Sequence, residues 1–506
     1  MKIRWLLIFI LLASNVFAQK NTKIKLVRAN KLSPAVYKGI KVQKLSGNVV
    51  FKHDKTIMYC DSSYFYEGSN ALDAFGHIHI NDNNKVHIYS DTLKYSGDNK
   101  IAILINNVQL EDSSMTLTTN KLKYNLRTKI GNYITGGKIV DNKNVLTSEH
   151  GFYHSDIKTF YFQKNVKLVN KEYTMTSDTL VYNTNSEMSY FKGPTLIVSK
   201  ENSIYCENGW YNSKTNISSY SDHTLLKNKD QKLYSDSLYY DKNNSFGEAY
   251  NNIILIDSVQ NIIIKGNTAF YQEGEGSSYV TDSSLAILIS GKENEDSLFL
   301  HADTLRIDFN KDQDAKKFIA YNKVKFFKTD IQGKCDSMVY NFEDSLLVMY
   351  QKPLIWGNNS QLSGKKIRAF MQNKKINRIY IDTNSFVLQH DTLDYYNQVS
   401  GKNMIAYFKD DSLKKVDVLG NAQSVYFVRD ENNNLVGVNL ISSSDMRLDF
   451  SSNGISNIVY MGRPKASLNP VEKVSKRALF LRNFKYYDDW RPKNKFDIFV
   501  FEPQKP

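Results

Sequence analysis

The sequence predicts an all-β protein in which repeated antiparallel strands form two sheets that face each other. The 506-residue chain has 33 Tyr and 27 Phe against only eight Pro, and aromatic and β-branched side chains suit a half-buried pleated surface. Clusters of Asn, Asp, Ser and Gly supply turns between the apolar runs. One short segment also recurs at a nearly constant spacing, which is typical of repeat architectures.

Residues 1–18 have the pattern of a secretory signal peptide. Lys2 and Arg4 precede the apolar run 6–12, and small residues lead up to Ala18. Neither this run nor any later one reaches the ~20 apolar residues of a transmembrane helix. We expect a mature chain from about Gln19, a lead-in to residue 40, and peripheral contact with membranes only through partners, since the first cysteine is Cys60.

The repeat is clearest in the segment Tyr89–Tyr95, which recurs at residues 176–182 and 234–240. An acidic residue or its substitute marks each copy. Spacings are 29 to 31 residues in the first half and 29 to 43 afterwards, so we place insertions in turns. We call this position the bend residue, and its thirteen occurrences are Asp61, Asp91, Asn120, Glu149, Asp178, Glu207, Asp236, Asn267, Asp303, Asp336, Lys365, Lys402 and Asp445.

The residues around the bend residue predict a strand folded into a V. The third residue before it is apolar in nearly every copy, and the second and fourth after it are also apolar. Side chains on a regular strand alternate with period two, so odd and even offsets cannot share one face unless a bulge changes the phase. The residue before the bend residue is small in all copies, as a crease requires. The later pairs include Leu93 and Tyr95, Leu122 and Tyr124, Leu180 and Tyr182, and Leu238 and Tyr240.

A second strand is expected about 17 residues after each bend residue, because apolar pairs with period two recur there. These pairs include Val49 and Phe51, Ile78 and Ile80, Val108 and Leu110, Val166 and Leu168, and Ile253 and Leu255. Each unit is therefore predicted to contain two antiparallel strands. Stacked units would build two facing sheets around a continuous apolar interior.

These motifs resemble the OstA-like (organic solvent tolerance) family of periplasmic lipopolysaccharide transport proteins. The resemblance rests on the Ser-Asp-Thr-Leu-x-Tyr strand, on following strands such as Gly47–Phe51, and on the ~29-residue spacing. It covers residues 41–465 and is strongest over 45–272. The chain is much longer than the family's small periplasmic bridge protein and lacks the long C-terminal barrel of the outer-membrane translocon.

The resemblance implies an elongated open β-jelly roll of V-shaped strands, whose apolar groove shields acyl chains while sugars stay in water. It also implies two partners: lipopolysaccharide or a related anionic glycolipid, and neighbouring jelly-roll proteins that pair edge to edge. The predicted groove-lining residues are Val49, Phe51, Ile78, Ile80, Leu93, Tyr95, Val108, Leu110, Leu122, Tyr124, Val166, Leu168, Leu180, Tyr182, Leu238, Tyr240, Ile253 and Leu255.

Residues 466–506 form a basic, aromatic tail in which the repeat stops. Apolar residues near Val471, Val474, Leu479 and Leu481 predict a short helix. One interpretation is a cap on the last repeat, because exposed edge strands are usually covered. The other is docking onto a partner.

The sequence favours no catalytic, metal or cofactor site. The repeated Asp could form a ladder of calcium ligands or acid-base pairs, but Lys365 and Lys402 occupy the same position, so we expect a bend residue bonded to backbone. His77 and His79, with His53 and His87, could form a zinc site. However, Ile78 and Ile80 point inward, so we expect these histidines to face solvent. No nucleophile or phosphate-binding motif is present.

The three cysteines are predicted to be unpaired. Cys60, Cys206 and Cys335 all occupy the small position before a bend residue. With adjacent strands ~4.8 Å apart, Cys60 and Cys206 are separated by at least about 24 Å. The Cα atoms of a disulfide lie within about 7 Å, so we expect buried thiols.

Charge and fold together suggest a binding protein rather than an enzyme. The formal charge of +14, or +12 without the two cations of the signal peptide (14 − 2), is spread along the chain. It fits either a solvated surface or attraction to an anionic glycolipid. No compact basic patch favours nucleic acid.

Three functions remain open from the sequence. The first is periplasmic transport of lipopolysaccharide toward the outer membrane, with the chain acting as a bridge. The second is a secreted structural or adhesive β-solenoid with a packed core, and the third is a carbohydrate-active enzyme on a β-helix. A lengthwise apolar cleft would distinguish transport from a solenoid closed by its own side chains.

Overall fold

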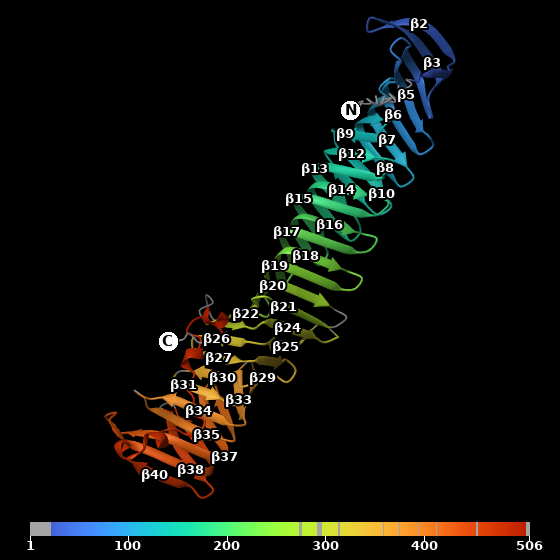
Figure 1. Cartoon of the computed structure of the whole chain (residues 1–506). Coiled ribbons are helices and arrows are strands. Elements are labelled where there is room, and N and C mark those ends of the chain that lie inside the picture. The colour runs from blue at the N-terminus through green and yellow to red at the C-terminus, as the bar shows by residue number, and fades with distance from the viewer. Residues whose placement is uncertain are drawn as a thin grey trace, which may run out of the picture. The chain divides into compact units, whose positions relative to one another are not determined.

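The computed structural model describes residues 22–272, 276–290, 296–311, 314–357, 359–373, 375–392, 394–410, 412–451 and 454–501. The predicted signal peptide lies outside these residues. The chain divides into two compact units, Met1–Thr195 and Leu196–Pro506 (Figure 1). The strands of unit 1 are β1 (Lys25–Arg28), β2 (Lys31–Tyr37), β3 (Ile40–His53), β4 (Thr56–Tyr66), β5 (Ala71–Asp82), β6 (Val86–Ser96), β7 (Ile101–Asp112), β8 (Met115–Asn125), β9 (Ile130–Tyr133), β10 (Gly137–Asp141), β11 (Val145–Ser148), β12 (His150–His154), β13 (Thr159–Val169), β14 (Tyr173–Asn183) and β15 (Met188–Ser199).

Unit 2 is also built from antiparallel strands, followed by short 3-10 helices. Its elements are β16 (Ser203–Asn212), β17 (Ile217–Lys227), β18 (Gln231–Asp241), β19 (Phe246–Asp257), β20 (Ile262–Gln272), β21 (Ser277–Thr281), β22 (Leu285–Leu288), β23 (Leu298–His301), β24 (Thr304–Phe309), β25 (Ala315–Tyr321), β26 (Val324–Phe327), β27 (Ile331–Cys335), β28 (Ser337–Asn341), β29 (Leu346–Tyr350), β30 (Leu354–Gly357), β31 (Ser360–Ser363), β32 (Lys366–Gln372), β33 (Lys375–Asp382), β34 (Ser385–His390), β35 (Tyr396–Gly401), β36 (Asn403–Lys409), β37 (Ser412–Arg429), β38 (Leu435–Ser451), β39 (Gly454–Met461), β40 (Lys465–Asn469), η2 (Val471–Lys473), η3 (Lys476–Leu479), η4 (Asp488–Trp490) and η5 (Asp497–Phe499).

The predicted bent strand is present, and the all-β jelly-roll fold is confirmed. In β6, the buried side chains fall at residues 86, 88 and 90 and then at 93 and 95, so the inward phase changes at Asp91. We call the half of each strand before the bend, such as 86–90, part of sheet I, and the half after it part of sheet II. The neighbouring strand β7 returns through sheet II and then sheet I.

The extra residues that produce the bend lie in the strand opposite the bend residue. Asn106 and Asn107 of β7 both have positive φ, at 60° and 48°, and the register of β6 and β7 shifts across them. Comparable left-handed pairs recur at Lys164–Asn165 and Asn251–Asn252. Asn tolerates this conformation better than most residues, which explains the Asn at these positions.

The expectation that the bend residue bonds to backbone is wrong for most copies with a described partner. Asp91 accepts a hydrogen bond from the Asn107 side-chain amide at 2.8 Å. The same side-chain contact, 16 residues along, joins Glu149 to Asn165 and Asp236 to Asn252. The second residue of each left-handed pair directs its side chain toward the bend. Its amide therefore binds the carboxylate of the bend residue. Near the last bend a backbone N–H, that of Gly420, does donate to Asp445.

The small residue before the bend residue has a second role besides fitting the crease. The Ser90 hydroxyl donates to the carbonyl of Thr92 at 3.1 Å, and Ser177 donates to Thr179 at 3.0 Å. This contact spans the bend within one strand. The position is also confined, because a Cβ on Gly266 would lie 2.3 Å from a Val280 methyl carbon.

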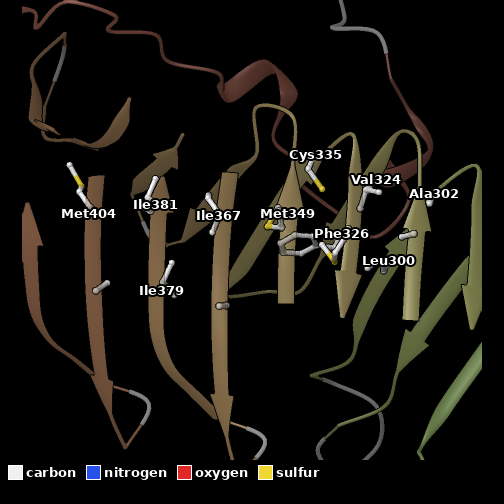
Figure 2. Close-up of a cluster of buried hydrophobic side chains, with 14 of the residues drawn as sticks. Leu300, Ala302, Val324, Phe326, Cys335, Met349, Ile367, Ile379, Ile381 and Met404 are labelled. Atoms are coloured by element: carbon white, nitrogen blue, oxygen red, sulfur yellow. The ribbon is translucent and has the colours of Figure 1, made fainter. Parts of the chain in front are cut away.

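Each unit has its own apolar interior between sheets I and II. In unit 1 it consists of side chains such as Phe51, Ile80 and Leu110, all fully buried. In unit 2 a continuous cluster runs from Ile264 to Leu448. Figure 2 shows members of this cluster, from Leu300 to Met404, projecting from successive strands into one interior.

The tail after β40 folds back along the outer face of sheet I in unit 2. Leu479 packs on Val425 and Phe427, whereas the Phe499 ring contacts His301 at a tilted angle, so the segment spans β37 to β23. We call residues 471–501 the strap. Its helical content is limited to 3-10 turns, and no described helix is long and apolar enough to cross a membrane.

Candidate functional site

The interior between sheets I and II is the candidate site, and the predicted lining residues all face it. In unit 1 every one of them is buried, with Phe51, Ile80 and Leu110 fully so. Of the four in unit 2, Leu238 and Ile253 are buried, while Tyr240 and Leu255 are half-exposed. The two units therefore present this interior differently to solvent.

In unit 1 polar side chains close the mouth of the V, where the ends of sheets I and II meet. Asp82 ends β5 in sheet I, and its carboxylate is only 3% exposed. It accepts hydrogen bonds from the Tyr124 hydroxyl of sheet II at 3.2 Å and from the Lys129 ammonium at 2.5 Å. Thr56 donates a further bond at 3.0 Å. We call such a Tyr, Asp and Lys contact across the mouth a clasp.

Polar contacts across the mouth occur at four successive levels of unit 1; two of them are the Tyr, Asp and Lys contact defined above, and we use the word clasp for all four. At the next level Tyr153 and Lys158 both bind Asp112, whose side chain is fully buried. One level further, Tyr182 donates to Asp141 at 3.0 Å. Lys143 and Glu187 form an ion pair at 2.7 Å, in which the cation comes from the sheet I side and the anion from the sheet II side. The first level consists of Tyr95 bonded to His53 at 2.6 Å and Lys100 paired with Asp54 at 2.5 Å.

The clasps at Asp82 and Asp112 are buried networks, whereas the Lys100–Asp54 and Lys143–Glu187 ion pairs of the other two levels are partly exposed. Burial is the main cause that raises the pKa of Tyr95, Tyr124 and Tyr182, so their hydroxyls remain protonated and can donate. Buried carboxylates need such partners, because an unpaired charge in a dry interior is costly. The clasps therefore hold the two sheets of unit 1 together at their open edge.

The sequence contains a second periodic signal, which marks the clasps. Tyr95, Tyr124, Tyr153 and Tyr182 lie four residues after a bend residue, and Lys100, Lys129 and Lys158 lie nine after it. Of these tyrosines, the apolar pattern predicts Tyr95, Tyr124 and Tyr182 as groove lining. A buried Tyr hydroxyl needs a polar partner. The constant offset of the lysines from the bend residue indicates where such partners lie.

In unit 2 the inward side chains near the mouth are half-exposed. We call this set the open strip: it consists of Ile204, Leu226, Leu233 and Leu255 from sheet I and Tyr211, Tyr240, Tyr271, Ile307 and Phe318 from sheet II. Leu288, which lies opposite Leu298 and Ile262 at the tip of sheet I, is 45% exposed.

The interior beneath the open strip contains many small side chains. Ala249 and Ala269 face each other across β19 and β20, and Gly247 and Ser278 flank Tyr271 in the neighbouring register. The corresponding region of unit 1 holds Tyr153, Phe160 and Phe162, whose rings stack at 4.1 and 5.5 Å between centroids. Unit 2 thus has a partly exposed apolar edge, and the inward side chains behind this edge are smaller than those of unit 1 at the level of Tyr153.

Among the other groups singled out in the sequence, His53 does not face solvent, because it is buried in the first clasp, whereas the remaining groups lie outside this interior or are inert. His77 binds Asp61 at 2.7 Å, and His79 lies 3.0 Å from His87. Among the described residues, no group of three or more His, Cys, Asp or Glu side chains is arranged to hold a metal ion. Cys60, Cys206 and Cys335 are free and buried, and burial raises the pKa of each thiol to about 12.

Comparison with protein families identifies the repeat. The family model described as OstA-like protein matches residues 21–178 and 176–236. Over residues 21–236 the chain is OstA-like. A second model, described as LptA/(LptD N-terminal domain) LPS transport protein, matches residues 294–375 of this OstA-like protein, so the two matches fall on both units.

Among solved structures, the OstA-like chain aligns with LptH, titled the LptA homologous periplasmic component of the conserved lipopolysaccharide transport device from Pseudomonas aeruginosa. The identity is 13%, the alignment covers 24% of this chain and 82% of that chain, and the TM-score is 0.20. No curated protein matches the chain in sequence.

Proposed function

We propose that this OstA-like protein is a periplasmic, non-catalytic carrier of lipopolysaccharide, with acyl chains held between sheets I and II and sugars in water. The observation that carries the proposal is the open strip of unit 2, an apolar surface turned inward yet reachable from solvent. Transferring acyl chains there is favourable by ~0.8 kcal/mol per buried CH₂. The family matches support the choice of lipid.

We further propose that the end strands pair with jelly rolls of neighbouring transport proteins, which makes the chain a bridge. Among the described strands β2 pairs only with β3, and β40 only with β38. Val36 in β2 is 70% exposed and Leu468 in β40 is 58% exposed. An apolar strand edge of this kind is a template for strand addition.

A structural or adhesive solenoid is the second candidate, because the interior of unit 1 is packed and clasped. Such a protein would need no lipid. The two functions differ in whether any inward side chain contacts lipid, and this difference defines the experiment.

The proposed function is tested by a photocrosslinking amino acid placed at Leu255, which faces inward, and at Lys265, which is exposed on the outer face of the same sheet. We expect lipopolysaccharide to be crosslinked from position 255 and not from position 265. Absence of lipid crosslinks from Leu255 and from other members of the open strip would favour the solenoid.

A further inference from the structure

We infer that the clasps close unit 1 to lipid, so that acyl chains are held in unit 2 alone; this inference rests on the proposed function. The starting observation is that one repeat pattern produces two kinds of interior. Unit 1 has clasps at four levels and fully buried lining residues. Unit 2 has the open strip.

The first step of the argument concerns access. An acyl chain that approaches Leu110 from the side must pass the mouth between sheets I and II. The carboxylates of Asp82 and Asp112 lie across this mouth with their partners, and neither is more than 3% exposed. Entry would separate a buried carboxylate from a Tyr hydroxyl and a Lys ammonium, and breaking such a pair is strongly unfavourable.

The second step concerns space. The stacked rings of Tyr153, Phe160 and Phe162 occupy the interior of unit 1 at their level, and a close-packed interior has no room for an additional chain. In unit 2, Ala249 and Ala269 occupy inward positions where large side chains would otherwise meet. An acyl chain laid along the open strip would cover its half-exposed apolar side chains.

The third step concerns the occupant. The open strip is apolar along its length, and it lies in the unit that contains the match to the lipopolysaccharide transport model at residues 294–375. A hydrocarbon chain with a hydrated head group satisfies both observations, because the apolar edge is covered and the head group stays in solvent. Unit 1 would then act as a spacer that supports the end strand β2.

The experiment compares photocrosslinking to lipopolysaccharide from Leu110 in unit 1 with that from Leu255 in unit 2, in the full-length protein. Because a buried clasp must break for lipid to enter unit 1, we expect labelling from Leu110 to be at least about tenfold weaker. Equal labelling from both positions would overturn this inference and leave the proposed function standing. No labelling from either position would instead count against the proposed function.

A clasp variant tests whether the polar contacts are the barrier. Asp112→Ala with Lys158→Ala removes the ion pair and leaves the surrounding aromatic rings, and Tyr153→Phe is a milder change that removes one hydroxyl. We expect labelling from Leu110 to rise in at least one variant that retains its circular dichroism spectrum. If folded variants leave labelling from Leu110 unchanged, the clasps are not the seal.

Discussion

At the residue scale, the bend is produced by three side chains with separate tasks. Ser90 bridges the bend to the Thr92 carbonyl, Asp91 reaches the opposite strand, and Asn107 provides the left-handed conformation and the amide that meets Asp91. Composition alone explains the turn-forming character of Asn and Ser. The pairing between Asp91 and Asn107 arises only when β6 and β7 are in register.

Substitution of Asn107 tests this division of tasks. Asn107→Val places a β-branched side chain at φ 48° and removes the bond to Asp91, so we expect unit 1 to lose at least ~1–2 kcal/mol of stability. Asn107→Gly removes the same bond without the steric cost and is expected to lose less. Urea unfolding followed by hydrogen exchange in β6 to β8 would measure both. A valine variant as stable as the glycine variant would contradict the conformational argument.

At the element scale, glutamines on alternate strands of sheet I hold the strap by hydrogen bonds to its backbone. Gln398 donates to the Leu479 carbonyl and accepts from the Leu481 N–H, both at 2.9 Å. Gln361 makes the same pair of bonds with Lys485 and Tyr487.

Arg491, six residues further along the strap, donates to Gln332 at 2.8 Å. Glutamines on alternate strands are about 10 Å apart. The strap uses six residues to span each of these intervals, so it is compact and not extended. In place of the predicted short helix, the tail forms four 3-10 turns among the described residues.

Removing one glutamine should loosen the strap locally. Gln361→Leu leaves the Lys485 carbonyl and the Tyr487 N–H without this partner, at a cost of ~1–3 kcal/mol for buried polar groups. We therefore expect amide exchange around residue 487 to accelerate about ten- to a hundredfold. Gln389→Leu, on the exposed part of neighbouring β34, is the matched control. Unchanged exchange in the Gln361 variant would show that apolar packing alone holds the strap.

At the scale of the whole molecule, both units bury a histidine that is kept neutral. Burial is the main cause that lowers the pKa of His53 in unit 1 and of His301 in unit 2. His53 bonds to Tyr95 in the first clasp. His301 lies under the strap, against Phe499, and its Nδ1 bonds to the Ser284 carbonyl at 2.7 Å.

These histidines predict a loss of stability in acid. Their folded pKa values lie below the ordinary value of 6.5, so the unfolded chain binds more protons as the pH falls. Their contribution is present above pH 6.5 and is lost as the pH falls through the folded pKa values.

Urea unfolding at pH 7.5 and 5.5 should show a smaller pH effect for His53→Gln and His301→Gln than for the native protein. His77→Gln is the control of opposite sign, because Asp61 raises the pKa of His77. An unchanged pH effect in both variants would assign the acid sensitivity to other groups.

The sequence by itself determined the repeat, the phase change at each bend residue and the inward position of every predicted lining residue, because periodicity and small side chains are local properties. It did not reveal the clasps, since Asp82 and Tyr124 are 42 residues apart and meet only when successive levels stack.

Tertiary structure also decided the course of the strap and the difference between the two interiors. Exposure of Leu255 and burial of Leu110 depend on what lies across the mouth. The inward phase of the apolar residues is the same at both positions, so the burial of Leu110 depends on the contacts that Asp82 and Asp112 make across the mouth.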